Sequence, residues 1–300
     1  MSKVDSLLKR IDSIIKATDE DITEKVSDFP GLDKIPSYIE DYEKKLAKCL
    51  RDEKKHFVKG IESFISKDEL TLEAIYNFVT QDLFAADVLS EEVEEITKEF
   101  LELTIAELCF EIMDAIDTDV GFKVFSSKTV EWINSWAEEL GKLMKLNSHK
   151  ALQNELIEVL EKGESIEKAV KRIKDLPQFN RNRARTTAIT EILTASSRAQ
   201  WESYMQSPAV KGKKWKHSGG KKINPREAHV DMDGTVIGID EKFDVNGYEA
   251  DYPRDPALPA SERVNCHCAM GPDIDTSILE LSKEEKEELR MQALEELGGE

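Results

Sequence analysis

The chain has no long apolar run, few cysteines and a shortage of basic residues, and each feature excludes a class of protein. No stretch of about 18 consecutive apolar residues occurs, so no membrane-spanning helix is expected. The N-terminal sequence lacks an apolar segment of signal-peptide length, which favours a cytoplasmic location. A disulfide framework is not expected in a cytosolic chain of this size, and a bridge from Cys266 to Cys268 would be strained.

Acidic residues outnumber basic ones by 61 to 42, which gives a formal net charge of −19. This balance argues against a general nucleic-acid coat protein, because binding phosphate requires Lys and Arg. The charge is unevenly distributed: residues 276–300 hold eight acids and three bases, whereas residues 211–226 hold seven bases and no acid. Residues 171–198 form a second basic cluster, with seven bases and two acids. Such local patches can still meet phosphate or an acidic partner.

The first half of the chain has the apolar periodicity of amphipathic helices. The predicted helices cover residues 2–28, Ser37–Ile65, Thr71–Phe84, Ser90–Ala115 and Ser127–Leu146. Phe29-Pro30-Gly31 interrupts the first helix, and Ser90 is the expected N-cap of the fourth. Residues 120–125 break the pattern as a loop or a short strand. Trp132 and Trp136 lie four residues apart, and core packing is the expected role for both.

The second half begins with a predicted helical hairpin over residues 149–162 and 165–174, which turns at Gly163, and a helix over Arg181–Met205. After Pro208, short apolar pieces alternate with turns, and Asp233-Gly234 is a hairpin signal. The predicted strands are Lys214–His217, Thr235–Ile239 and Lys242–Val245. A capping box at Ser282 predicts a charged C-terminal helix that is solvated or docked on a partner.

These patterns predict an α+β fold, in which a long, mainly helical N-terminal region precedes a small β-rich, turn-rich C-terminal module. The expected divisions are a helical region for partner docking at residues 1–148, a domain at 149–275 and an acidic helix at 276–300. The domain at 149–275 comprises helices over 149–205 and the β-rich module over 210–275.

His229, Cys266 and Cys268 form the best set of metal ligands, with His217 or His267 as a candidate fourth ligand. Zinc prefers four ligands of this type, and a structural zinc ion would stabilise a small, loop-rich module. The C-x-C spacing differs from the usual C-x-x-C. In the alternative, the cysteines are reduced and hold the module by packing against neighbouring strands.

Catalytic chemistry has weaker support in the sequence. Asp231 and Asp233 beside His229 could act in a metal-dependent nuclease or as a general acid–base set. The Asp-x-Asp-Gly string is also an ordinary turn. The chain has no Gly-rich phosphate loop, no H-E-x-x-H and no G-x-S-x-G, so we do not expect an enzyme.

The basic run around Trp215 has two interpretations. It is either a solvated loop or a contact with nucleic-acid backbone or an acidic protein surface. Its candidate contact residues are Lys211, Lys213, Lys214, Lys216, Lys221 and Lys222. Glu191 likewise has two interpretations, as a helix-surface salt bridge near Arg185 or as an anchor for an arginine, such as Arg226, from the β-rich module.

The order of these motifs resembles the phage head morphogenesis domain of the minor head protein family typified by the F protein of phage Mu. The resemblance covers about residues 150–275. It consists of R-x-x-A-I-T-E-I-x-x-A, K-W, N-P-R-E-A-H, D-G, a phenylalanine, Y-P-x-D-P and N-C-H-C in that order. The chain departs from the family at Ile189 and His267, where an arginine is common.

The resemblance implies a minor capsid protein that associates with the portal during procapsid assembly. Scaffold or major capsid protein and DNA are further candidate partners, and no membrane is implied. The implied location is the virion, in the head interior or portal region, after assembly in the host cytoplasm. The residues that match the family's motif positions are Glu191, Trp215, Arg226, His229, Gly234, Phe243, Pro253, Cys266 and Cys268. The hypothesis from a different class is a metal-dependent nucleic-acid-processing enzyme.

Overall fold

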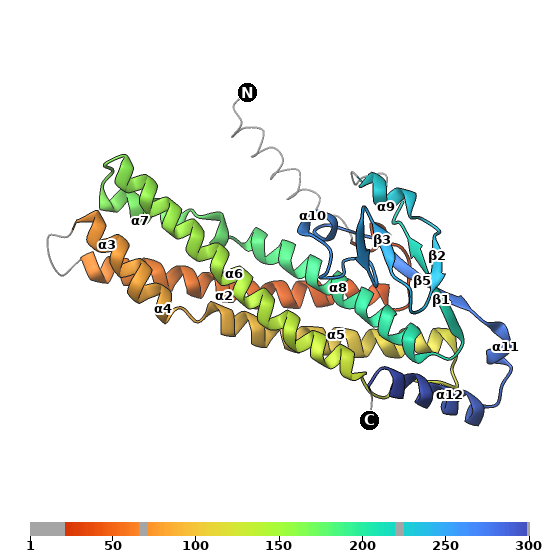
Figure 1. Cartoon of the computed structure of the whole chain (residues 1–300). Coiled ribbons are helices and arrows are strands. Elements are labelled where there is room, and N and C mark those ends of the chain that lie inside the picture. Colours follow the sequence, from red (N-terminus) through yellow and green to blue (C-terminus); the bar gives the residue numbers. More distant parts are fainter. Residues whose placement is uncertain (1–21, 66–70, 220–224, 299–300) are drawn as a thin grey trace. The chain divides into compact units, whose positions relative to one another are not determined.

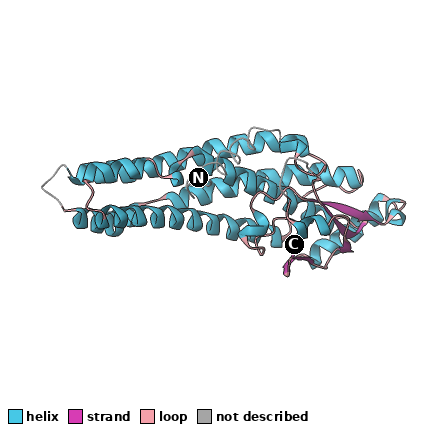
Figure 2. Ribbon diagram, turned by 90° about the horizontal axis from the view of Figure 1, so that it is seen from above, coloured by secondary structure: helices cyan, strands magenta, loops and turns pink. Residues whose placement is uncertain are grey.

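The computed structural model describes residues 22–65, 71–219 and 225–298 of the chain. It divides into two compact units, with unit 1 formed from the described parts of residues 1–39, 100–133 and 189–300, and unit 2 from 40–99 and 134–188. Four long helices contribute residues to both units (Figure 1), namely α2 (Ile35–Ile65), α5 (Leu89–Ile116), α6 (Ser127–Glu161) and α8 (Arg181–Gln206). Helices dominate the described residues (Figure 2), and all of the described strands belong to unit 1, which confirms the α+β prediction.

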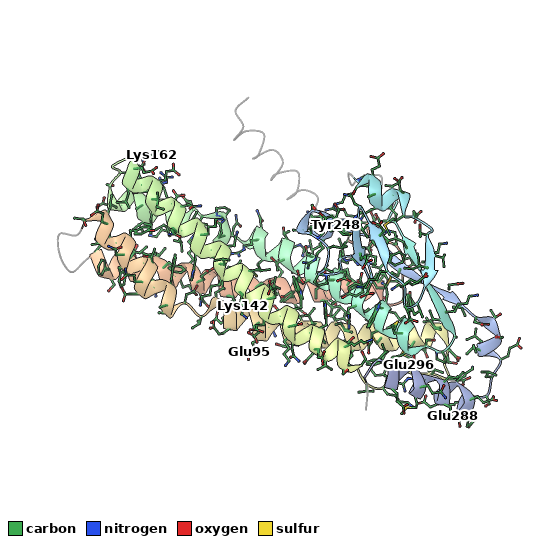
Figure 3. The ribbon with its side chains drawn as sticks, in the orientation of Figure 1. Glu95, Lys142, Lys162, Tyr248, Glu288 and Glu296 are labelled. Carbon is green, nitrogen blue, oxygen red and sulfur yellow. The ribbon has the colours of Figure 1, made fainter. Side chains whose placement is uncertain are left out.

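Unit 2 is helical and has its own apolar core. Its other elements are α3 (Leu72–Phe78), the π-helical turn η3 (Val79–Leu83), α4 (Phe84–Ala86), α7 (Ile166–Lys174) and the 3-10 turn η4 (Pro177–Phe179). The Thr71 side chain caps α3 by accepting from the Ala74 amide at 3.2 Å. Phe57 of α2 lies fully buried in the core and packs edge-on against Phe84. Charged side chains extend from the exposed side of α6 at Lys142 and directly after its end at Lys162 (Figure 3).

Two predicted helix boundaries in this region are wrong. The chain is helical without a break from Ser127 to Glu161, so the expected boundary between residues 148 and 149 falls inside α6. Ser148 remains in the helix because it is buried, with its hydroxyl within hydrogen-bond distance of Glu53 and Arg183. Helix α5 begins at Leu89, whose amide donates to the Asp87 carboxylate. Asp87, rather than the predicted Ser90, therefore caps the first turn of the helix. The predicted turn at Gly163 is confirmed, with φ 59°.

The N-terminal part of unit 1 differs from the predicted helix over residues 2–28. Most of that helix lies outside the described residues, and Ile22–Glu24 form only a 3-10 turn, η1. A second 3-10 turn, η2 (Leu32–Lys34), follows Gly31, which has a left-handed φ of 85°. Residues 120–125 form a loop, not a strand. Among the described helices, none has the combination of length and apolar character that crossing a membrane requires.

A three-stranded antiparallel sheet forms the centre of the C-terminal module, with β1 (Val210–Lys216) between β2 (Val236–Gly238) and β5 (Ala269–Ile274). A separate hairpin pairs β3 (Phe243–Val245) with β4 (Tyr248–Ala250). The three predicted strands are present with shifted bounds, whereas β4 and β5 were not predicted. Asp233-Gly234 does not form a two-residue hairpin, because the short helix α9 (Glu227–Asp231) lies between β1 and β2. Gly234 has φ 82° and its amide donates to the Trp215 carbonyl at 2.9 Å.

The module also contains α10 (Ala260–Arg263), and the chain ends with α11 (Thr276–Leu279) and α12 (Lys283–Glu296). The predicted capping box of α12 is confirmed, since Ser282 and Glu285 satisfy each other's backbone amides. Instead of being fully solvated, α12 packs within unit 1 against the segment that follows α5. Lys286 lies 2.9 Å from the carboxylates of both Asp117 and Asp119, while Glu288 on the other side of the helix is exposed (Figure 3).

Candidate metal centre

Three of the predicted metal ligands come together in the module. His229 lies on α9, and its Nδ1 is 3.5 Å from Cys266 Sγ and 3.6 Å from Cys268 Sγ. Each of the three residues is 2% exposed, and both cysteines are free thiols. A tetrahedral zinc ion, with Zn–S of about 2.3 Å and Zn–N of about 2.0 Å, places sulfur and nitrogen ligands about 3.5 Å apart. The observed separations therefore fit a shared metal ion.

The local fold explains why these side chains meet. Cys268 directly precedes β5, which pairs along β1 so that Trp215 lies opposite Met270. Cys266 follows Asn265, whose left-handed φ of 56° turns the chain after α10. The fully buried Trp215 packs edge-on against His229, with ring centroids 5.7 Å apart, and against Phe243 at 5.2 Å. Two of the predicted motif positions, Trp215 and Phe243, thus form an apolar wall around the ligands.

Arg254 holds the backbone of the two cysteines in place. Its Nη1 donates to the carbonyl oxygens of Cys266 at 2.9 Å and Cys268 at 2.6 Å. Its other nitrogens donate to the Leu193 carbonyl and the Ser197 hydroxyl of α8. Burial lowers the pKa of Arg254, while the neighbouring thiols favour its charged form. Sequence reasoning missed this residue, although it follows Pro253 within the Y-P-x-D-P motif.

A carboxylate fixes the orientation of the His229 ring. Its Nε2 lies 3.0 Å from Glu262 Oε2 on α10, and Arg226 Nε lies 3.8 Å from the same oxygen. A proton shared along the Nε2–Glu262 contact leaves Nδ1 free to bind a metal, which is the usual outer-sphere arrangement around a histidine ligand. Arg226 therefore pairs with Glu262, while the interpretation that Glu191 anchors an arginine of the β-rich module stays a prediction. Glu191 is 3% exposed within α8, so the surface salt-bridge interpretation is wrong.

The two thiols differ in their affinity for protons. A hydrogen bond from Cys268 lowers the pKa of the Cys266 thiol well below its usual value, and the nearby His229 and Arg254 act in the same direction. The same bond, together with burial, raises the pKa of Cys268. The pair thus favours one thiolate next to a protonated thiol. Because the thiolate is the form that binds metals, this environment suits a metal ligand.

Neither candidate for the fourth ligand joins the group. His217 Nδ1 accepts a hydrogen bond from the Gly219 amide at 3.1 Å, and the ring lies outside the cluster. His267 is half-buried and also lies outside the cluster; burial lowers its pKa to about 4. Within the described residues the centre therefore offers three protein ligands, and a tetrahedral ion would need one more.

The structure describes four of the six candidate contact lysines, and two of these four are exposed. Lys213 is fully buried, with its ammonium 5.6 Å from the Phe243 ring centroid. The prediction that Lys213 is a contact residue is therefore wrong. Lys216 donates to the Asp28 carbonyl, whereas Lys211 and Lys214 are exposed. The remaining two lysines, Lys221 and Lys222, lie outside the described residues.

The two aspartates near His229 also stay out of the metal centre. The Asp233 carboxylate accepts a hydrogen bond from the His217 amide at 2.8 Å, which is a turn role, and neither Asp231 nor Asp233 belongs to the ligand group. The structure therefore favours the ordinary-turn interpretation of the Asp-x-Asp-Gly string over the acid–base one.

Comparison with known proteins adds two findings. Residues 150–271 match the family described as Phage Mu protein F like protein, and this segment contains all nine motif positions and the whole metal centre. The chain is also 51% identical over 301 residues to the uncharacterized protein YqbB of Bacillus subtilis strain 168, across 98% of this chain and 99% of that protein. No solved structure gives a significant match.

Proposed function

Because the chain belongs to the phage Mu protein F-like family, we propose that it is a minor head protein that acts in phage head morphogenesis. The match to residues 150–271 is the observation that carries this proposal. The metal centre supports a structural role over catalysis, because its three ligands are each 2% exposed and a substrate has no access to them. The proposed location is the virion, in the head interior or portal region, after assembly in the host cytoplasm.

The proposed cofactor is a structural zinc ion held by His229, Cys266 and Cys268. When bound, it would tie α9 to the segment that precedes β5, and so join loops that are distant in sequence. Trp215 shields the ligands and Arg254 fixes the carbonyls of both cysteines. All of these contacts stabilise the module.

The proposed partner is the portal protein, with scaffold or major capsid protein as further partners, and residues 1–148 as the docking region. Two large apolar side chains on α5 support this assignment, since Leu103 is 44% exposed and Phe110 is 55% exposed. Exposed apolar side chains on a helix are the usual anchors of helix-mediated docking. For DNA contact, the support is limited to the exposed Lys211 and Lys214.

The test is co-expression with the portal protein of the same phage, followed by affinity capture of the portal and size-exclusion chromatography. We expect the chain to co-elute with the portal ring. A Leu103→Asp variant should lose at least tenfold in affinity, whereas Met291→Asp, at a similarly exposed position on α12, should bind normally. Absence of the unaltered chain from the portal fractions would contradict the proposed association.

The competing enzymatic function receives one point of support, since three protein ligands is the number typical of catalytic zinc. It requires metal-dependent cleavage of DNA by the purified protein that disappears in His229→Ala. Intact DNA in the presence of stoichiometric zinc would reject it.

A further inference from the structure

Unit 2 contains a cavity of about 400 Å³ whose polar lining is mainly basic. Arg51 and Lys54 of α2, Lys174 at the end of α7 and Arg181 at the start of α8 contribute four positive charges, and Asp175 contributes one negative charge. Lys174 and Arg181 belong to the basic cluster that the sequence shows at residues 171–198.

The positive charges in this cavity are only partly neutralised by the protein. Lys174 pairs with Glu62 at 2.9 Å, and Arg181 pairs with Glu43 at 2.6 Å. Lys54 donates to the Lys174 carbonyl, which carries no formal charge. Within the described part of the chain, neither Arg51 nor Lys54 forms an ion pair with a carboxylate. Neighbouring like charges repel each other, so a bound anion would relieve this repulsion.

From the cavity and its charges, we propose that unit 2 binds a phosphate group between Arg51 and Lys54. Guanidinium and ammonium groups are the side chains that bind phosphate, through forked hydrogen bonds and as a point charge respectively. A single carboxylate would leave one of these two cations without a counter-charge, whereas a phosphate monoester carries about −1.5 to −2 charges. The head-assembly proposal is not needed for this assignment.

The rest of the cavity indicates a phosphate ester instead of a bare ion. Its volume falls in the range of about 300–1,000 Å³ that small-molecule sites occupy. Leu176 and Phe179 line it beside the cations and provide an apolar surface for a sugar or a base. These features favour a free nucleotide, whose terminal phosphate is a monoester, over a DNA strand, whose phosphodiesters carry one charge each.

The experiment is calorimetric titration of the full chain at low salt with three probes: inorganic tripolyphosphate, ATP and a blunt DNA duplex. The test variant is Arg51→Gln with Lys54→Gln. The matched control is Lys55→Gln with Lys59→Gln, which removes the same charge from the exposed surface of the same helix. Circular dichroism establishes that both variants keep their helical content.

We expect tripolyphosphate to bind the unaltered chain and the control alike, and to bind the test variant at least tenfold more weakly. If ATP shows this dependence on Arg51 and Lys54 and DNA does not, the ligand is a free nucleotide. If the duplex shows it and ATP does not, the ligand is the DNA backbone and the assignment to a phosphate monoester is wrong. Absence of tripolyphosphate binding, or an equal loss in both variants, would overturn the proposal.

Discussion

Glu53 of α2 shows how a single buried carboxyl group makes folding depend on pH. It is 4% exposed and accepts a hydrogen bond from the Ser148 hydroxyl at 3.1 Å. Burial, reinforced by the charge of Asp87, raises the pKa of Glu53 to about 8, although Ser148, Arg183 and Lys145 oppose the shift. In the unfolded chain its pKa is about 4.3. Between these two pKa values, the Glu53 carboxyl group is therefore protonated in the folded protein and ionised in the unfolded chain.

This difference predicts that Glu53 destabilises the fold as pH rises from about 4 to 8. The free energy of unfolding should fall by at most about 1.4 kcal/mol per pH unit through this residue, and the loss should level off above its folded pKa. Glu53→Gln keeps the neutral shape and removes the titration. Urea unfolding at pH 5 and pH 8 should show a gain in the stability of the variant over the unaltered chain at pH 8. The same pH dependence in both proteins would exclude Glu53 as its source.

Individual residues also show what the sequence can reveal about the candidate site. His229, Cys266 and Cys268 were predictable because these residue types are scarce and have few structural roles outside metal binding or packing. Arg254 and Glu262 were not, because they act on the ligands through a backbone carbonyl and a ring nitrogen. In the sequence, charged residues that make such contacts cannot be distinguished from exposed charged residues, because the contacts form only in the folded chain.

At the scale of elements, the apolar periodicity of the sequence predicted the helices whose bounds depend on local interactions. Helices α2, α5 and α8 agree with their predicted bounds within two residues, because a regular apolar stripe specifies a helix. The break predicted in α6 was wrong because the polar Ser148 is satisfied by distant residues. Strand β5 contains Gly271 and Pro272, and only its pairing with β1 at the sheet edge makes it a strand.

The proposed zinc ion should control the stability of the elements that its three ligands connect, which are α9 and the segment from α10 to β5. Purified protein should contain about one zinc per chain by elemental analysis, and a chelator should lower the melting temperature by several degrees. The reason is that a ligand bound only to the folded state stabilises it, by about 4 kcal/mol at a thousandfold excess over Kd. Cys266→Ser should lower the melting temperature and abolish the chelator effect.

The matched control for this experiment is Cys49→Ser, because Cys49 is a buried free thiol outside the ligand group. It should retain both the zinc and the response to chelator. Zinc-free protein with an unaltered melting temperature would instead support the alternative in which the two thiols only pack.

At the scale of the whole molecule, the charge of −19 has two consequences that oppose each other. Repulsion among 61 acidic residues acts over the entire chain and disfavours the compact state. The cations that line the cavity of unit 2 act over a short distance and favour a bound anion. Salt screens both interactions, since the Debye length falls from about 30 Å at 0.01 M to about 10 Å at 0.1 M.

Raising sodium chloride from about 10 mM to about 200 mM should therefore raise the melting temperature while it weakens tripolyphosphate binding, since both effects come from the same screening. Differential scanning fluorimetry and calorimetric titration on one preparation measure the two quantities. Arg51→Gln with Lys54→Gln should keep the increase in melting temperature, because most of the acidic charge is unaffected, and should remove the salt dependence of binding. A melting temperature that falls with salt would mean that attractive ion pairs, such as the one between Arg181 and Glu43, outweigh the repulsion of the excess acidic charge.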